Sequence, residues 1–112
     1  MKNLSLEEFR LRNFLDRCRE IIENKPENLK LIPRKKNMDS LYSMGLTPLD
    51  IEEIVCDLTP ENYFRGPSPD HNFPNEEVWE FKILYEEFRI YIKLKLKEEE
   101  FVICISFHED EI

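Results

Sequence analysis

The segment from Val78 to His108 contains three runs in which apolar and polar residues alternate with a period of two. Such alternation is typical of β-strands that bury one face, because successive side chains point to opposite sides of a sheet. Short acidic stretches, Glu86-Glu87 and Glu98 to Glu100, separate the runs. The sequence therefore predicts three consecutive antiparallel strands, and the rest of the chain must pack around them.

The register of the first hairpin follows from the face that each run buries. A slip of one residue would turn every side chain of a strand to the opposite side. A two-residue turn at Glu86-Glu87 keeps the apolar residues together and places Ile83 opposite Ile90 and Glu80 opposite Lys93. A four-residue loop is an alternative, because Glu-Glu is a poor hairpin turn. It would keep the faces but shift the partners.

The same reasoning predicts a two-residue turn at Glu98-Glu99 in the second hairpin. That turn would place Tyr91 opposite Ser106 and Arg89 opposite His108. A four-residue loop is again the alternative. The buried positions of the third strand would be Phe101, Ile103, Ile105 and Phe107, and the opposite positions would be Val102, Cys104, Ser106 and His108.

The N-terminal part of the chain predicts an amphipathic helix from Ser5 to Asn24. Ser5 is a good N-cap, and Glu8 three residues later completes the pattern of a capping box. Lys25-Pro26 ends the helix, since proline cannot continue it. The buried stripe would consist of Leu6, Phe9, Phe14, Cys18, Ile21 and Ile22.

Shorter elements are predicted between this helix and the strands. Leu29 to Ile32 is a candidate short strand, and Asn37 to Met44 is a helix that ends at Gly45. Thr47 caps a third helix, which has proline at its first position. Gly66 to Asn75 contains three prolines and is expected to be extended without regular structure. The buried sides of the two helices would be Met38, Leu41, Tyr42 and Met44 in one and Leu49, Ile51, Ile54, Val55 and Leu58 in the other.

The polar face of the predicted sheet gathers residues that suit acid–base chemistry. Glu80, Tyr91 and His108 lie on three adjacent strands and face one way, and Arg65 enters from the preceding loop. A carboxylate and an imidazole can divide the roles of base and acid near neutral pH. A nearby cation stabilises the charge that builds on a phosphate. The set predicts a catalytic site for RNA cleavage by the substrate's own 2′-hydroxyl, with no metal and no other cofactor.

Basic residues around this set are candidate RNA contacts. Each site residue also has a structural interpretation: Glu80 can pair with Lys93 across strands, Tyr91 is a good strand former, and His108 and Arg65 can be ordinary surface residues. Another basic cluster, Arg34 to Lys36, is either a solvated loop or a phosphate contact outside the site. The candidate RNA-binding residues are Lys82, Arg89, Lys93, Lys95 and His71.

Length and charge limit the class of protein. A chain of 112 residues with a net charge of −8 is expected to form a single α+β domain over residues 1–112, with helices packed on the apolar face of an antiparallel sheet. The negative charge argues against indiscriminate phosphate binding. Without a signal peptide or an apolar run of about 18 residues, we expect a cytoplasmic protein that does not enter a membrane. Three scattered cysteines favour neither a disulfide framework nor a zinc site.

Four segments of the chain resemble a known family. They are LTPLDIEEIVCDLTPENYFRGP, PDHNFPNEEVWEF, IYIKLKL and VICISFH. The resemblance runs from about Leu31 to His108 and is clearest from Gly45 onward. The four segments are similar to the MqsR-type toxins, which belong to the RelE-like superfamily of mRNA interferases from type II toxin–antitoxin pairs. The resemblance implies N-terminal helices on a curved antiparallel sheet, metal-independent endoribonuclease activity, a cognate antitoxin protein, and mRNA, on or off the ribosome, as the substrate.

The resemblance also implies which positions form the active site. The family's active-site positions fall on Arg65, Glu80, Tyr91 and His108. One member of the family has lysine, glutamine and lysine at the positions of Arg65, Glu80 and His108. The cationic positions are kept and a carboxylate is added. Two alternatives follow from these departures and from the net charge: a non-catalytic acidic interaction module, or a degenerate toxin that binds a protein partner without cleaving RNA.

Overall fold

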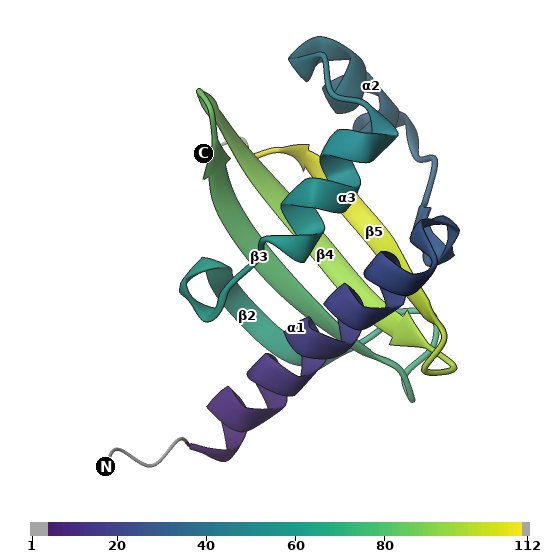
Figure 1. Ribbon diagram of the computed structural model, residues 1–112, viewed down its shortest axis with the longest axis vertical. Coiled ribbons are helices and arrows are strands. Elements are labelled where there is room, and N and C mark those ends of the chain that lie inside the picture. Colours follow the sequence, from purple (N-terminus) through teal and green to yellow (C-terminus); the bar gives the residue numbers. More distant parts are fainter. Residues whose placement is uncertain (1–4, 111–112) are drawn as a thin grey trace.

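The computed structural model of the protein describes residues 5–110 and shows helices packed on one face of a five-stranded sheet (Figure 1). The strand order is β1-β5-β4-β3-β2, and all pairings are antiparallel except that of β1 with β5. The predicted α+β class is therefore confirmed. The helices are α1 (Leu6–Asn24), α2 (Lys35–Met44) and α3 (Pro48–Cys56), and the strands are β1 (Leu29–Leu31), β2 (Tyr63–Pro69), β3 (Glu77–Tyr85), β4 (Phe88–Lys97) and β5 (Phe101–Glu109).

Helix α1 begins where the sequence predicts, because the Ser5 side chain accepts a hydrogen bond from the Glu8 backbone N–H at 3.1 Å. Its buried face is shifted at the N-terminal end. Leu6 and Phe9 were expected in the core but are exposed, and Leu11 and Leu15 are buried instead. None of the helices in residues 5–110 is long and apolar enough to cross a membrane.

Helices α2 and α3 follow their predicted signals. Gly45 has a φ of 69° at the end of α2, a left-handed conformation that glycine adopts without strain. Thr47 and Asp50 form a complete capping box at the start of α3. The prediction of their buried sides is wrong for three residues, which are exposed in the structure: Met38, Tyr42 and Leu49.

The register between β3 and β4 is the predicted one. Ile83 pairs with Ile90, and Glu80 pairs with Lys93, across a two-residue turn. Glu86 adopts a φ of 55° in that turn, which allows the tight connection despite the unfavourable Glu-Glu sequence. Trp79 and Phe81 consequently face α1, where both rings stack on Phe14.

The register between β4 and β5 differs from the prediction. The turn contains three residues, Glu98 to Glu100, so Lys95 pairs with Ile103 near the turn. A β-bulge then leaves Ile105 without a partner, and beyond it Tyr91 pairs with His108. The predicted pairs of Tyr91 with Ser106 and of Arg89 with His108 are therefore wrong, because the strand gains one residue at the turn and another at the bulge.

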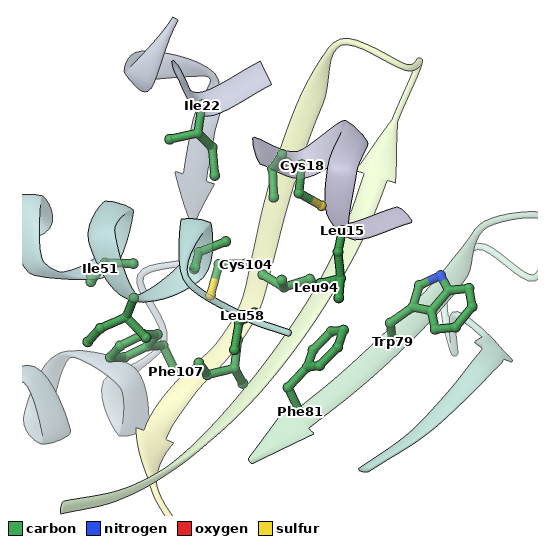
Figure 2. Close-up of a cluster of buried hydrophobic side chains, with 14 of the residues drawn as sticks. Leu15, Cys18, Ile22, Ile51, Leu58, Trp79, Phe81, Leu94, Cys104 and Phe107 are labelled. Atoms are coloured by element: carbon green, nitrogen blue, oxygen red, sulfur yellow. The ribbon is translucent and has the colours of Figure 1, made fainter. Parts of the chain in front are cut away.

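The bulge changes which side of β5 enters the core. On the turn side of Ile105, Val102 and Cys104 are fully buried in the core cluster, although both were expected on the polar face. Beyond the bulge Phe107 is buried as expected. Figure 2 shows Cys104 and Phe107 among the side chains between the sheet and the helices. Three other residues of β5 were expected in the core but are only half-buried: Phe101, Ile103 and Ile105.

The edge of the sheet beside the bulge is completed by a side chain. Strand β1 ends at Leu31, so it does not reach the second half of β5. The fully buried Asn37 of α2 takes its place: its amide nitrogen donates to Ile105 O at 3.0 Å and to Ile32 O at 2.9 Å, and its oxygen accepts from Phe107 N at 3.1 Å. One carboxamide therefore satisfies three backbone groups and fixes α2 to the sheet.

Candidate active site

The face of the sheet opposite the core carries a buried carboxylate, Glu80, which lies on β3 and is only 3% exposed. Its Oε2 accepts a hydrogen bond from Arg65 Nε at 2.7 Å, and its Oε1 accepts one from the Tyr91 hydroxyl. The alternative partner considered from the sequence, Lys93, lies opposite Glu80 in register but forms no ion pair with it. Both carboxylate oxygens are thus held by residues of the candidate set.

Arg65 reaches Glu80 from a strand and not from a loop. Strand β2 extends to Pro69, so the first part of the predicted irregular segment Gly66 to Asn75 is paired with β3. Arg65 is the direct register partner of Glu80. Gly66 follows with a φ of 120°, and a Cβ atom there would lie 2.8 Å from Val78 O. The close approach of β2 to β3 beside Arg65 therefore requires glycine.

The hydrogen bonds around Glu80 fix its protonation state. Burial alone would raise the pKa of Glu80, but the hydrogen bonds from Arg65 and Tyr91 and the positive charges of Arg65 and Lys93 outweigh it, so the pKa lies below its ordinary value. Burial and the hydrogen bond to the Glu80 carboxylate both raise the pKa of Tyr91. Near neutral pH the pair therefore consists of a carboxylate and a protonated phenol.

His108 lies beside Tyr91 on β5. The two residues are register partners, and their ring centroids are 5.2 Å apart. The imidazole is largely buried, and its Nδ1 lies 3.0 Å from the Glu109 carbonyl oxygen. A carbonyl oxygen only accepts, so this contact places a hydrogen on Nδ1 and leaves the lone pair of the neutral ring on Nε2.

An aromatic residue that the sequence analysis did not single out borders the set. Phe64 is 43% exposed, with Lys82 Nζ 4.1 Å and the Arg65 guanidinium carbon 5.3 Å from its ring centroid. Strict alternation would separate neighbours such as Phe64 and Arg65 onto opposite faces. The register of β2 shifts between Tyr63 and Arg65, which leaves Phe64 without a partner in β3 and brings its ring to these two cations.

Arg34, which the sequence left open between a solvated loop residue and a phosphate contact outside the site, lies just before α2. Its Nη1 is 3.4 Å from Ser106 Oγ and 3.5 Å from Ile105 O. Ser106 is the register partner of Lys93, which in turn lies opposite Glu80. The sequence offered only one signal for Arg34, its place in the basic cluster with Lys35 and Lys36.

The candidate RNA-binding residues have different surroundings. Lys95 is 6% exposed, and its Nζ lies 2.7 Å from Asp70 Oδ2 and 2.6 Å from Glu76 Oε1, so its charge is engaged within the protein. The same contacts tie the loop between β2 and β3 to the sheet. His71 is exposed in that loop, towards the Lys95 end of the face.

Two further candidates lie at the other end. Lys82 forms an ion pair of 3.2 Å with Asp110, and Arg89 is exposed two residues before Tyr91. The structure thus gathers Arg65, Glu80, Tyr91 and His108, with Lys82 and Lys93 beside them, and leaves Lys95, His71 and Arg89 nearer the margins.

Two of the three cysteines, Cys18 and Cys104, are buried in the core, whereas Cys56 is only partly buried. Burial raises the pKa of Cys104 to about 12 and raises that of Cys18 as well. A buried thiol with a raised pKa is a poor nucleophile and a poor metal ligand. Over residues 5–110, no three His, Cys, Asp or Glu side chains converge as ligands of a metal ion would.

Comparison with known proteins places the chain in a family. No curated protein matches it. A family model described as "Motility quorum-sensing regulator, toxin of MqsA" matches residues 14–109, which include all five strands and every residue of the candidate site. The four segments that resemble MqsR-type toxins lie within this match, and the helices on a mostly antiparallel sheet agree with a RelE-like fold. The chain therefore belongs to the MqsR toxin family.

Proposed function

We propose that the protein is the toxin of a toxin–antitoxin pair and that it cleaves mRNA by attack of the 2′-hydroxyl on the adjacent phosphate. The observation that supports this most strongly is the Glu80 carboxylate, held by Arg65 and Tyr91 with His108 alongside, on the face opposite the helices. Membership of a toxin family supports the same conclusion.

In the proposed reaction Glu80 is the general base. Glu80 is ionised near neutral pH, so its carboxylate can accept the proton of the 2′-hydroxyl as the 2′-oxygen bonds to phosphorus. Tyr91 remains protonated and orients the carboxylate. His108, protonated at Nε2, gives a proton to the 5′-oxygen as the P–O5′ bond breaks. The products are a 2′,3′-cyclic phosphate and a free 5′-hydroxyl.

A bound RNA needs a positive charge near its phosphate and an aromatic surface on which a nucleobase can stack. The Arg65 side chain is 66% exposed although its Nε holds Glu80, so its remaining N–H groups are available to a phosphate oxygen. Phe64 presents a ring on which a nucleobase can stack, beside Lys82. Lys93 and Arg89 extend the contact along β4. Lys95 has no place in this proposal because Asp70 and Glu76 already neutralise it.

The net charge of the chain and its family suggest which molecules it binds. With a net charge of −8, the protein attracts free RNA weakly, so we propose that mRNA on the ribosome is the principal substrate. The family description names a toxin of MqsA. We accordingly propose a cognate antitoxin protein that binds and neutralises this chain.

The decisive experiment is inducible expression in a bacterium with mapping of new RNA 5′ ends. We expect growth arrest and new 5′-hydroxyl ends with the wild type, and loss of both with Glu80→Gln and with His108→Ala. Glu87→Gln is the matched control, because it removes the same charge at an exposed turn. Equal cleavage by wild type and His108→Ala, in cells and on ribosome-bound mRNA, would refute the mechanism.

A second candidate is a degenerate toxin or an acidic interaction module, which the net charge of −8 favours. Such a protein would bind its antitoxin without cutting RNA. The same experiment separates the two, because a degenerate toxin produces no new 5′ ends while its complex with the antitoxin survives the Glu80→Gln and His108→Ala substitutions.

A further inference from the structure

A line of polar side chains crosses the sheet at the level of Glu80. The register pairs Arg65 with Glu80, Glu80 with Lys93, and Lys93 with Ser106. Arg34 continues the line past β5, since its guanidinium lies 3.4 Å from Ser106 Oγ. The line therefore runs perpendicular to the strands from one side of the candidate active site to the edge of the sheet.

The cations at the two ends of this line differ in whether a neighbouring carboxylate pairs with them. Arg65 is paired with Glu80. In the part of the chain that the structure describes, neither Lys93 nor Arg34 forms an ion pair, although acidic residues outnumber basic ones by 24 to 16. Ser106, between them, is 4% exposed and holds one Nη atom of Arg34. Among the described residues, the side of the face towards β5 thus carries two cations that are not held in an ion pair.

The spacing suits an extended ligand. Neighbouring strands lie about 4.8 Å apart, so three steps from β3 to the position beyond β5 span roughly 14 Å. That length exceeds the single phosphodiester linkage that Glu80 and His108 would act on. Because Glu80 lies on β3 and His108 on β5, a cation beyond β5 lies outside the span between them and suits a phosphate that neighbours the cleaved linkage.

Backbone groups at the bulge and just after β1 hold Arg34 in this position. The Ile105 carbonyl accepts from Asn37 at 3.0 Å and lies 3.5 Å from Arg34 Nη1. The Arg34 backbone N–H also donates to Ile32 O at 2.8 Å. The backbone and the guanidinium of Arg34 are thus both held by the protein. Its neighbour Lys35 instead forms an ion pair with Asp39, and Lys36 is exposed.

We propose that Arg34, positioned by Ser106 and assisted by Lys93, binds an RNA phosphate outside the scissile linkage. This subsite rests on the proposed function, because it assigns the direction in which the RNA strand crosses the sheet. Arginine suits the role, since its planar fork contacts one hydroxyl and still offers donors to a phosphate. RNA would run across the strands from Phe64 and Arg65 on β2 towards the start of α2.

The test measures binding of single-stranded RNA of two lengths at low salt, in the cleavage-silent His108→Ala background. We expect Arg34→Gln to weaken binding of an octanucleotide about tenfold and to leave binding of a dinucleotide unchanged. The slope of log affinity against log salt should fall by about 0.7, the value for one phosphate contact on a single strand. Arg34→Lys should recover part of the loss.

Lys36→Gln is the matched control, because it removes the same charge two residues away without touching Ser106. We expect wild-type affinity for both lengths. Lys93→Gln is a second test variant that does not alter the packing of Arg34, and it should also act on the longer RNA.

The outcomes separate this inference from the proposed function. Octanucleotide binding that depends on Arg34 in a protein that never cleaves RNA would support the subsite and refute the nuclease. Cleavage by the wild type with unchanged octanucleotide affinity in both Arg34→Gln and Lys93→Gln would overturn the subsite alone. A wild-type protein that binds no octanucleotide at low salt would also overturn it, whatever its cleavage on ribosomes.

Discussion

Tyr91 donates its hydroxyl hydrogen to Glu80 although the two residues are diagonal, not direct, partners on β4 and β3. Tyr91 is paired in register with Lys82, and Glu80 with Lys93. A long aromatic side chain can bridge such a diagonal. The contact holds one carboxylate oxygen while Arg65 holds the other, and it makes Tyr91 the link between Glu80 and the His108 ring.

Removal of that hydroxyl should impair catalysis more than binding. For Tyr91→Phe we expect kcat to fall by about 100-fold with little change in KM, because a donor that orients the reacting carboxylate is lost while the ring is retained. Steady-state cleavage of ribosome-bound mRNA measures the effect. Tyr42→Phe, at an exposed tyrosine of α2, should leave kcat unchanged. Equal kcat in Tyr91→Phe and wild type would contradict the proposed orientation of Glu80.

Glu80 should make folding stability depend on acid pH. Its pKa is depressed in the folded state, so the unfolded chain binds the proton more readily and stability falls as pH drops below about 4.3, the ordinary glutamate value. Asp70, whose pKa Lys95 also lowers, adds to this loss. Urea unfolding between about pH 7 and pH 3 should give a shallower loss for Glu80→Gln than for wild type. An identical slope in Glu80→Gln and Glu87→Gln would disprove the contribution.

Substitution of Lys95 should lower the stability of the fold without changing the affinity for RNA. Lys95→Met leaves the carboxylates of Asp70 and Glu76 without their partner at a largely buried position, and we expect a loss on the order of 3 kcal/mol in the free energy of unfolding. Lys97→Met, at an exposed position of the same strand, is the control and should change little. At a temperature where Lys95→Met is folded, its RNA affinity should equal that of the wild type. A selective loss of RNA affinity would return Lys95 to the binding surface.

Asn37 should be a determinant of folding. Asn37→Ala removes the partner of three backbone groups at Ile32, Ile105 and Phe107, so we expect a loss of about 2–3 kcal/mol in the free energy of unfolding. Denaturant titration measures it, with Asn13→Ala on the exposed side of α1 as the control. A loss below about 0.5 kcal/mol, the range of ordinary surface substitutions, would show that water replaces the carboxamide.

The parts of the fold that were predictable from the sequence depend on local signals. Ser5, Gly45 and Thr47 each act within a few residues, and the β3–β4 register follows from alternation across a two-residue turn. Leu6 and Phe9 were misplaced because periodicity defines an apolar stripe but not how far the sheet extends beneath the helix.

The candidate site was predictable where alternation is unbroken. Glu80 and Tyr91 lie on strands with regular pairing, and their common face was expected. Phe64 lies where the β2 register shifts, and Arg34 meets Ser106 only because α2 packs against β5. Lys95 looked like another exposed lysine, since its partners Asp70 and Glu76 come from a loop whose path the sequence does not specify.

The unpaired Ile105 divides β5 into two halves that serve different purposes. The half before it supplies Val102 and Cys104 to the interior, and the half after it presents Ser106 and His108 to the opposite side. Loss or gain of a single residue between Cys104 and His108 would exchange those orientations and carry the imidazole beneath the helices. Relatives of this protein should therefore tolerate many replacements within that stretch but preserve its length.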